Sequence, residues 1–141
     1  LCPVDYHRFH FPCAGTPGET RTINGPLFSV SPLALRQKLS YLWENKRTVT
    51  ELVTKDFGTV ICMEIGATCV GSIHQTFIPG QEVAKGAEKG YFAFGGSSTL
   101  LLFEPNSVTL TNDLLESSRR MIELYAKVGT KAGDQLEGDT Q

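Results

Sequence analysis

Hydrophobic and polar residues alternate through the middle of the chain, and this pattern predicts a group of β-strands. The strand-like segments are rich in β-branched residues and cover residues 48–54, 59–73 and 99–105. A Lys-Asp-Phe-Gly turn joins the first two segments, and glycines at positions 80, 86 and 90 are spaced as in short hairpins. We therefore expect a compact β core in the centre of the molecule.

Helical patterns lie on either side of this core. A first helix is predicted to begin after Ser31, an N-cap residue, with Pro32 in the first helical position. A second helix is predicted over residues 112–128 with Asn112 as its cap, and the acidic residues 130–141 are predicted to be a disordered tail. The pattern as a whole predicts an α+β fold that is mainly β.

Composition narrows the class of protein. The 141 residues are enough for a single domain, and a net charge of −2 without clustered lysine and arginine argues against nucleic-acid binding. The apolar runs are shorter than the roughly 18 residues that cross a bilayer. The four cysteines form no CxxC pair, so a zinc site is not expected; Cys62 and Cys69 are predicted to be buried thiols. The chain begins with leucine, so we expect it to be part of a longer protein.

Two of the three histidines lie three residues apart, in the sequence "DYHRFHFP". In a helical turn His7 and His10 would share a face, whereas in a strand they would point to opposite faces. The flanking Pro3 and Pro12 favour the turn, so we expect both imidazoles to face one site. The alternative is a capped helix with polar aromatic residues at its edge. A zinc site with His74 would lack the HExxH motif, so no metal is predicted.

The sequence Gly95-Gly96-Ser97-Ser98 interrupts a segment that otherwise resembles a buried strand. A glycine-rich hairpin is one explanation, and a serine hydrolase is disfavoured because the G-x-S-x-G elbow is absent. Flexible glycines also permit a third chemistry, in which the Ser97 hydroxyl attacks the carbonyl carbon of Gly96. The resulting ester can eliminate to dehydroalanine, and hydrolysis then gives a pyruvoyl group at a new N-terminus.

Six segments in order closely resemble the phosphatidylserine decarboxylase family between Leu1 and Pro105. They are "DYHRFHFP", "FSVSPLAL", "ENKR", "IGATCVGSI", "PGQEVAKGAEKGYFAFGGSS" and "LLLFEP". The fifth is also similar to the hairpins of lipoyl-type domains, which implies a barrel-sandwich-like β core with a few peripheral helices. The family's upstream Ser-Pro-x-Asp-Gly motif is absent from this sequence, so we expect residues 1–141 to be the C-terminal catalytic portion, a single domain.

The resemblance implies a role for each matching position. Cleavage between Gly96 and Ser97 would give a β chain of residues 1–96 and an α chain of residues 97–141, with the pyruvoyl cofactor derived from Ser97. His10 matches the base for self-cleavage, and His7 matches the histidine linked to substrate binding and decarboxylation. Further candidates for substrate binding are His74, Ser98 (where the family usually has threonine) and Phe77, for which core packing is the alternative.

The resemblance also implies an activity, partners and a location. The activity is that of a carboxy-lyase which converts phosphatidylserine to phosphatidylethanolamine in phospholipid biosynthesis. The partners are phosphatidylserine, a membrane surface, and the enzyme's own α and β chains as a heterodimer that could dimerise further. The location is peripheral, at a bacterial cytoplasmic membrane or an organelle membrane. The alternatives are a decarboxylase of a soluble amino acid and an unprocessed, non-enzymatic barrel-sandwich binding domain.

Overall fold

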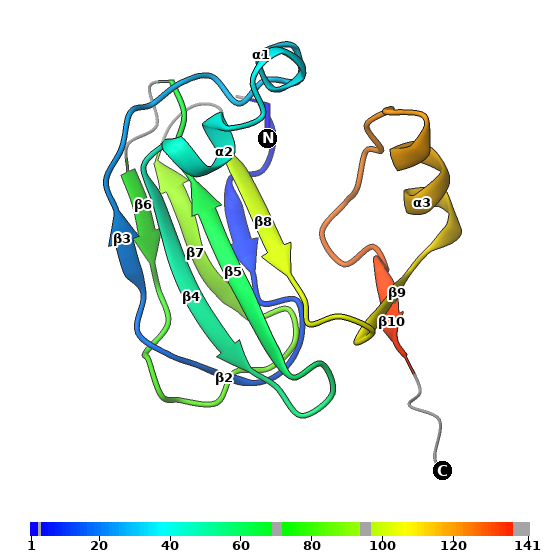
Figure 1. Cartoon of the computed structure of the whole chain (residues 1–141). Coiled ribbons are helices and arrows are strands. Elements are labelled where there is room, and N and C mark those ends of the chain that lie inside the picture. Colours follow the sequence, from blue (N-terminus) through cyan, green and yellow to red (C-terminus); the bar gives the residue numbers. More distant parts are fainter. Residues whose placement is uncertain (3, 69–71, 94–96, 137–141) are drawn as a thin grey trace.

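The computed structural model describes residues 1–2, 4–68, 72–93 and 97–136, and its core consists of two antiparallel sheets that face each other (Figure 1). The β7 sheet has the strand order β1 (Arg8–His10), β7 (Glu88–Ala93) and β6 (Ser72–Gln75). The β5 sheet has the order β2 (Thr16–Pro17), β4 (Arg47–Val53), β5 (Thr59–Ile65) and β8 (Ser98–Leu102), and β3 (Arg21–Ile23) also pairs with β4. The prediction of a mainly β fold is confirmed; the described strands form a sandwich-like core and close no barrel.

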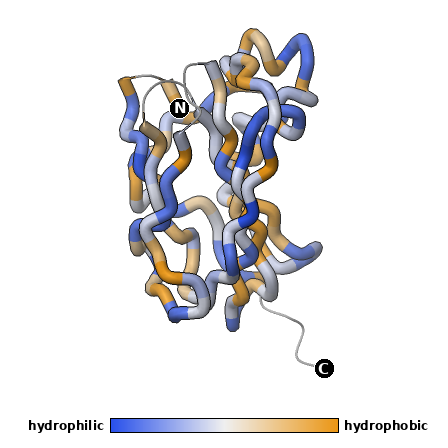
Figure 2. Tube along the Cα trace, turned by 90° about the vertical axis from the view of Figure 1, so that its left-hand side faces the viewer, coloured by the Kyte–Doolittle hydropathy of each residue, from blue (hydrophilic) through white to orange (hydrophobic). Residues whose placement is uncertain are grey.

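The β4–β5 hairpin confirms the strands predicted from the alternating pattern. Its register runs from Arg47 opposite Ile65 to Val53 opposite Thr59. Every second residue of β4 is buried between the sheets, as expected for a strand with one covered face. Gly58 closes the hairpin with a φ of +65°, a conformation that L-residues with a side chain rarely adopt. Hydrophobic and hydrophilic residues alternate along the strands of the traced chain (Figure 2).

Two groups of apolar side chains fill the space between the sheets. The larger group contains Phe11, Cys13, Leu52, Val60 and Cys62. The smaller group consists of Phe9 and Phe92, whose rings meet edge to face at 5.0 Å, together with Ile73. The prediction that Cys62 is buried is confirmed, and Cys69 lies outside the described residues.

The predicted first helix is present but divided. Ser31 is the N-cap of α1 (Pro32–Gln37), and its hydroxyl accepts a hydrogen bond from the amide of Ala34 at 3.4 Å. The helix ends at Lys38, and a short α2 (Tyr41–Glu44) follows. The capping prediction is therefore confirmed, because it depends only on local backbone chemistry.

The predicted helix over residues 112–128 is wrong in length and in its cap. The observed α3 covers Asn112–Arg119, and its N-cap is Thr111. Met121 adopts a φ of +54°, and the amides of Met121 and Ile122 donate to the carbonyls of Ser118 and Ser117. These two bonds form a Schellman motif, which ends the helix although the apolar pattern continues.

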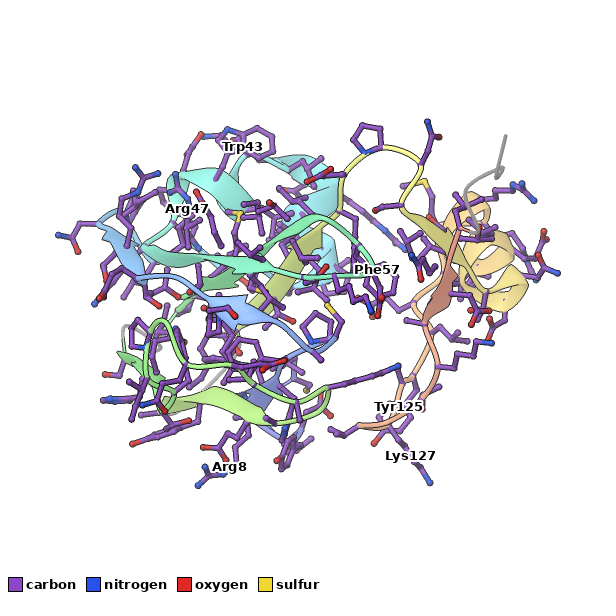
Figure 3. The ribbon with its side chains drawn as sticks, turned by 90° about the horizontal axis from the view of Figure 1, so that it is seen from below. Arg8, Trp43, Arg47, Phe57, Tyr125 and Lys127 are labelled. Carbon is purple, nitrogen blue, oxygen red and sulfur yellow. The ribbon has the colours of Figure 1, made fainter. Side chains whose placement is uncertain are left out.

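The C-terminal part of the chain lies to one side of the two sheets (Figure 1). Its strand β9 (Val108–Leu110) pairs with β10 (Gly133–Gln135), so the prediction that the tail is disordered is wrong for residues 133–135. Residues 137–141 lie outside the described part. Figure 3 shows Tyr125 and Lys127 on the segment after α3, and Arg8 and Trp43 on opposite sides of the molecule.

Candidate active site

Ser97 lies directly before β8 and has an unusual environment. Its relative exposure is 0%, and its hydroxyl oxygen has no hydrogen-bond partner among the described residues. Its carbonyl oxygen accepts a hydrogen bond from the backbone nitrogen of Leu1 at 2.8 Å. A buried hydroxyl without a partner costs about 1–3 kcal/mol, so stability alone does not explain a serine at this position. Gly95 and Gly96 lie outside the described residues.

The strand before the predicted cut is held on both sides. Strand β7 is central in its sheet and pairs with β1 and β6. Near its C-terminal end, the amide of Phe92 donates to the carbonyl of His7 at 2.9 Å. His7 therefore lies beside the end of β7 that leads towards Ser97.

The imidazole of His7 is oriented by the backbone. Its Nδ1 lies 2.6 Å from the carbonyl oxygen of Asp5, and because a carbonyl only accepts, Nδ1 donates. In the neutral ring Nε2 is then the basic nitrogen. The Asp5 carboxylate has another role, since it accepts from the amide of Cys2 at 2.6 Å. The described contact thus fixes the tautomer of His7, with the proton on Nδ1.

His10 lies at the other end of β7, where it pairs with Glu88. Its Nδ1 donates to the carbonyl of Gly86 at 2.9 Å, and in that tautomer Nε2 accepts from the hydroxyl of Tyr6 at 2.9 Å. Glu88 and Ala93 bound β7, whose five steps span about 17 Å. The contacts of His10 therefore place it away from the end of β7 beside which His7 lies.

The predicted helical turn around His7 and His10 is wrong, because residues 8–10 form β1. The prolines were expected to direct this segment into a turn. Instead, its backbone N–H and C=O groups form hydrogen bonds with β7, about 80 residues further along the chain. Three residue steps separate the two histidines, which is roughly 10 Å of extended chain. The described contacts therefore do not bring the two imidazoles to one place, and the role of each remains a prediction.

The further candidates for substrate binding lie in three different environments. His74 is exposed on β6, and its ring stacks on Tyr91 at 4.8 Å. Phe77 packs edge to face against Phe11 at 5.3 Å, which is a core contact. Ser98 is half-buried and pairs with Ile65 at the start of β8. Of these three, only Ser98 lines the cleft described next.

A cleft of about 1210 Å³ opens beside Ser98, between the N-terminal segment, α1 and the chain after α3. Its wall has two cationic side chains, Arg8 and Lys127, two acidic side chains, Asp5 and Glu123, and apolar side chains that include Leu35 and Val128. Arg8 already pairs with Glu88 at 2.7 Å, which lowers the pKa of that carboxyl. The cleft therefore offers both charge and apolar surface next to the predicted cut.

A buried ion pair was not identified from the sequence. Lys89 and Glu64 are 2.9 Å apart, and their side chains are 2% and 3% exposed. Burial lowers the pKa of Lys89, and the nearby Glu64 carboxylate only partly opposes this effect. The sequence did indicate that Glu64 is buried, because it continues the series of every second residue, Val60 and Cys62, that faces the core along β5. The inward orientation of Lys89 had no comparable signal.

Comparison with known proteins gives a consistent result. The model of the family described as phosphatidylserine decarboxylase matches residues 1–134. A phosphatidylserine decarboxylase proenzyme of Chlamydia pneumoniae is 55% identical over 133 residues, which are 94% of this chain and 44% of that protein. The proenzyme of Clostridium botulinum is 47% identical over 136 residues, 96% of this chain and 46% of that protein. The chain thus spans about half the length of the curated relatives it matches.

Proposed function

Because the chain belongs to the phosphatidylserine decarboxylase family, we propose that it is the catalytic part of a pyruvoyl-dependent enzyme that converts phosphatidylserine to phosphatidylethanolamine. The observation that carries this proposal is the Ser97 hydroxyl, which is buried and lacks a partner among the described residues. A buried hydroxyl that no described residue engages keeps its lone pairs free to attack the preceding carbonyl, and it can still donate its proton to a base. The same environment suits a cofactor that is made from this residue.

Self-cleavage balances without an external oxidant or reductant. Ser97 Oγ loses its proton to a base and attacks the carbonyl carbon of Gly96, and the peptide bond is replaced by an ester. Loss of the Ser97 α-proton expels the Gly96 carboxylate and leaves dehydroalanine at the new N-terminus. Tautomerisation and hydrolysis release ammonia and leave the pyruvoyl group. The family resemblance implies His10 as the base, a role that requires another conformation than the one described, in which His10 contacts Gly86 and Tyr6 near the start of β7. We assign proton return to the product to His7.

The residues around Ser97 fit a pyruvoyl group at that position. The group supplies an electrophilic carbonyl that binds the substrate amine and accepts electron density as carbon dioxide leaves. Strand β8 holds its carrier in place through pairing with β5, which begins at Ser98 opposite Ile65. In our proposal His7, once it is protonated at Nε2, returns the proton to the product. Arg8 and Lys127 would face an anionic headgroup in the cleft.

The proposal includes partners and a location. Residues 1–96 and 97–141 would remain together as a β chain and an α chain, and two such heterodimers could associate. The enzyme would act as a peripheral protein at a membrane that contains its lipid substrate. None of the helices in the described residues has the length and apolar character needed to cross a membrane.

Intact mass spectrometry of the full-length protein tests the proposal. We expect two chains that separate after Gly96, with a blocked, pyruvoyl-bearing N-terminus on the second. Ser97→Ala should remain a single chain, whereas Ser98→Ala, the matched control, should still be cut. Release of carbon dioxide from phosphatidylserine vesicles, compared with free serine, separates lipid from amino-acid substrates. A single uncut wild-type chain would identify a non-enzymatic domain and contradict the proposal.

A further inference from the structure

A β-bulge turns Lys89 into the space between the two sheets. Strand β1 pairs Phe9 with Gly90 and His10 with Glu88, so Lys89 has no opposite residue on β1. Glu88 forms its ion pair on the outer face, with a side chain that is 33% exposed, whereas the Lys89 side chain is 2% exposed. Bulges redirect side chains in this way and occur often near active sites. A specific backbone irregularity therefore places this charge inside the molecule.

The buried charge has a full set of partners on both sheets. Lys89 Nζ donates to Glu64 at 2.9–3.0 Å and to the side-chain oxygen of Gln75 at 2.8 Å. Glu64 also accepts from the hydroxyl of Thr48 at 2.6 Å and from the Gln75 amide at 3.0 Å. Lys89 and Gln75 come from the β7 sheet, and Glu64 and Thr48 come from the β5 sheet. These bonds therefore link one sheet directly to the other.

Aromatic rings restrict the position of the lysine further. The ring centroids of Phe9 and Phe77 lie 5.5 Å and 5.3 Å from Nζ. Cation–π contacts of this length stabilise a charge that has left water. The ammonium group is therefore held by hydrogen bonds to Glu64 and Gln75 and lies near two aromatic rings.

On the β5 sheet, the link lies near the proposed cut. The Gly96–Ser97 bond is in the segment that joins β7 of one sheet to β8 of the other. Glu64 pairs with Thr99 on β8, one position from the pair of Ile65 and Ser98. Any slide of one sheet over the other would change how the two strands approach at this bond.

We propose that Lys89 and Glu64 form a positioning pair for self-cleavage, which fixes the register of the β7 sheet against the β5 sheet and so sets the approach of the two strands that the scissile bond joins. This inference rests on the proposed function. An apolar pair of the same size would fill the space equally well. It would lack directional bonds, however, so the sheets could shift by fractions of an ångström, which is enough to slow an attack that needs close alignment.

The test separates positioning from stability. Removing one partner of a buried pair leaves an uncompensated charge, whereas replacing both by apolar residues is often neutral for stability. We therefore expect Lys89→Met to lower the melting temperature and the double variant Lys89→Met/Glu64→Met to recover most of it. Thr48 and Gln75 can keep the hydrogen bond at 3.2 Å that already joins them. Melting temperatures are measured in a Ser97→Ala background, where every protein is a single chain.

The self-cleavage rate is then measured for the full-length protein after cell-free synthesis. We expect the double variant to be cut at least tenfold more slowly than the wild type, although its stability is restored. The matched control is Lys38→Met/Glu44→Met, which removes an exposed lysine–glutamate pair at 3.1 Å and should be cut at the wild-type rate. If the double variant is unfolded at the assay temperature, the Glu64→Gln variant is measured in its place. The temperature is then one at which the protein carrying both Glu64→Gln and Ser97→Ala is folded.

Each outcome decides the inference. A double variant, or a Glu64→Gln replacement, that is cut at the wild-type rate would overturn it and leave the pair a purely stabilising role. A wild-type protein that is cut, with an uncut Ser97→Ala, supports the proposed function whatever the double variant does. A wild-type protein that remains uncut removes both the proposed function and the inference that depends on it.

Discussion

Gly90 is the position on β7 where the fold has no room for a side chain. A methyl group there would overlap the backbone oxygen of His74 and lie 2.7 Å from a ring carbon of Phe9. The oxygen belongs to the neighbouring strand β6, so it cannot rotate away as a flexible side chain could. We therefore predict that Gly90→Ala forces β6 or β1 away from β7.

The structure gives a magnitude for this prediction. Overpacking a tight site costs about 1–3 kcal/mol, and losing the Phe9–Phe92 edge contact costs about 0.5–1.5 kcal/mol more. We expect a loss of about 3 kcal/mol in the free energy of unfolding, or about 10 °C in melting temperature for a domain of this size. Gly80→Ala is the matched control, because Gly80 has a φ of +78° and open space around it. Its backbone strain alone should cost about 1 kcal/mol.

Thermal and urea unfolding, followed by circular dichroism in a Ser97→Ala background, measure both variants. We expect Gly90→Ala to lose about 2 kcal/mol more than Gly80→Ala, because the first adds a steric clash whereas the second costs only backbone strain. Equal losses for the two variants would refute the packing of Phe9 over Gly90 and the register of β1 with β7. That register also places His7 and His10, so the measurement bears directly on the candidate site.

Two further predictions concern buried polar groups. The Asn45 amide donates to the carbonyls of Phe28 and Gly66 at 2.7 and 2.9 Å, so Asn45→Asp should cost about 3 kcal/mol at pH 7, where a carboxylate faces two acceptors. The folded state raises the pKa of that aspartate, so the loss of unfolding free energy relative to the wild type should become smaller as the pH falls. Urea unfolding curves that give the same loss at pH 7 and pH 4 would contradict this. Burial raises the pKa of Cys62 to about 12, so at pH 8.5 fewer than about one thiol in a thousand is ionised. Iodoacetamide should therefore label the exposed Cys2 and spare Cys62 in the native protein, and mass spectrometry that finds equal labelling would refute the burial.

Local patterns predicted the parts of the fold that local forces determine. The β4–β5 hairpin follows from alternation and a glycine turn, and the start of α1 follows from Ser31 as its cap. The conformation around His7 and His10 was missed because pairing with β7, distant in sequence, decided it. The end of α3 was missed because Met121 entered a left-handed conformation that its residue type does not suggest.

In the candidate site too, the local sequence predicts some features, whereas others depend on residues that are distant in sequence. The sequence motif made Ser97 a candidate, and the structure adds that its hydroxyl is buried without a partner among the described residues. The motif could not reveal that His7 and His10 lie along different parts of β7. Nor could it reveal the inward position of Lys89, because a bulge shifts the alternation that a sequence pattern assumes to be regular.

A chain that cuts itself between β7 and β8 must hold both new ends by contacts other than the lost bond. The upstream end is secure, because β7 is central in its sheet and the amide of Phe92 is bonded to His7. The downstream end carries Ser97 directly before β8, an edge strand whose partner in the described sheet is β5. Strand β5 therefore holds the end that would become the cofactor in the proposed function, and Glu64, the partner of Lys89, lies on the same strand. The buried link is thus attached to the strand that pairs with β8, through which the position of the β7 sheet can reach Ser97.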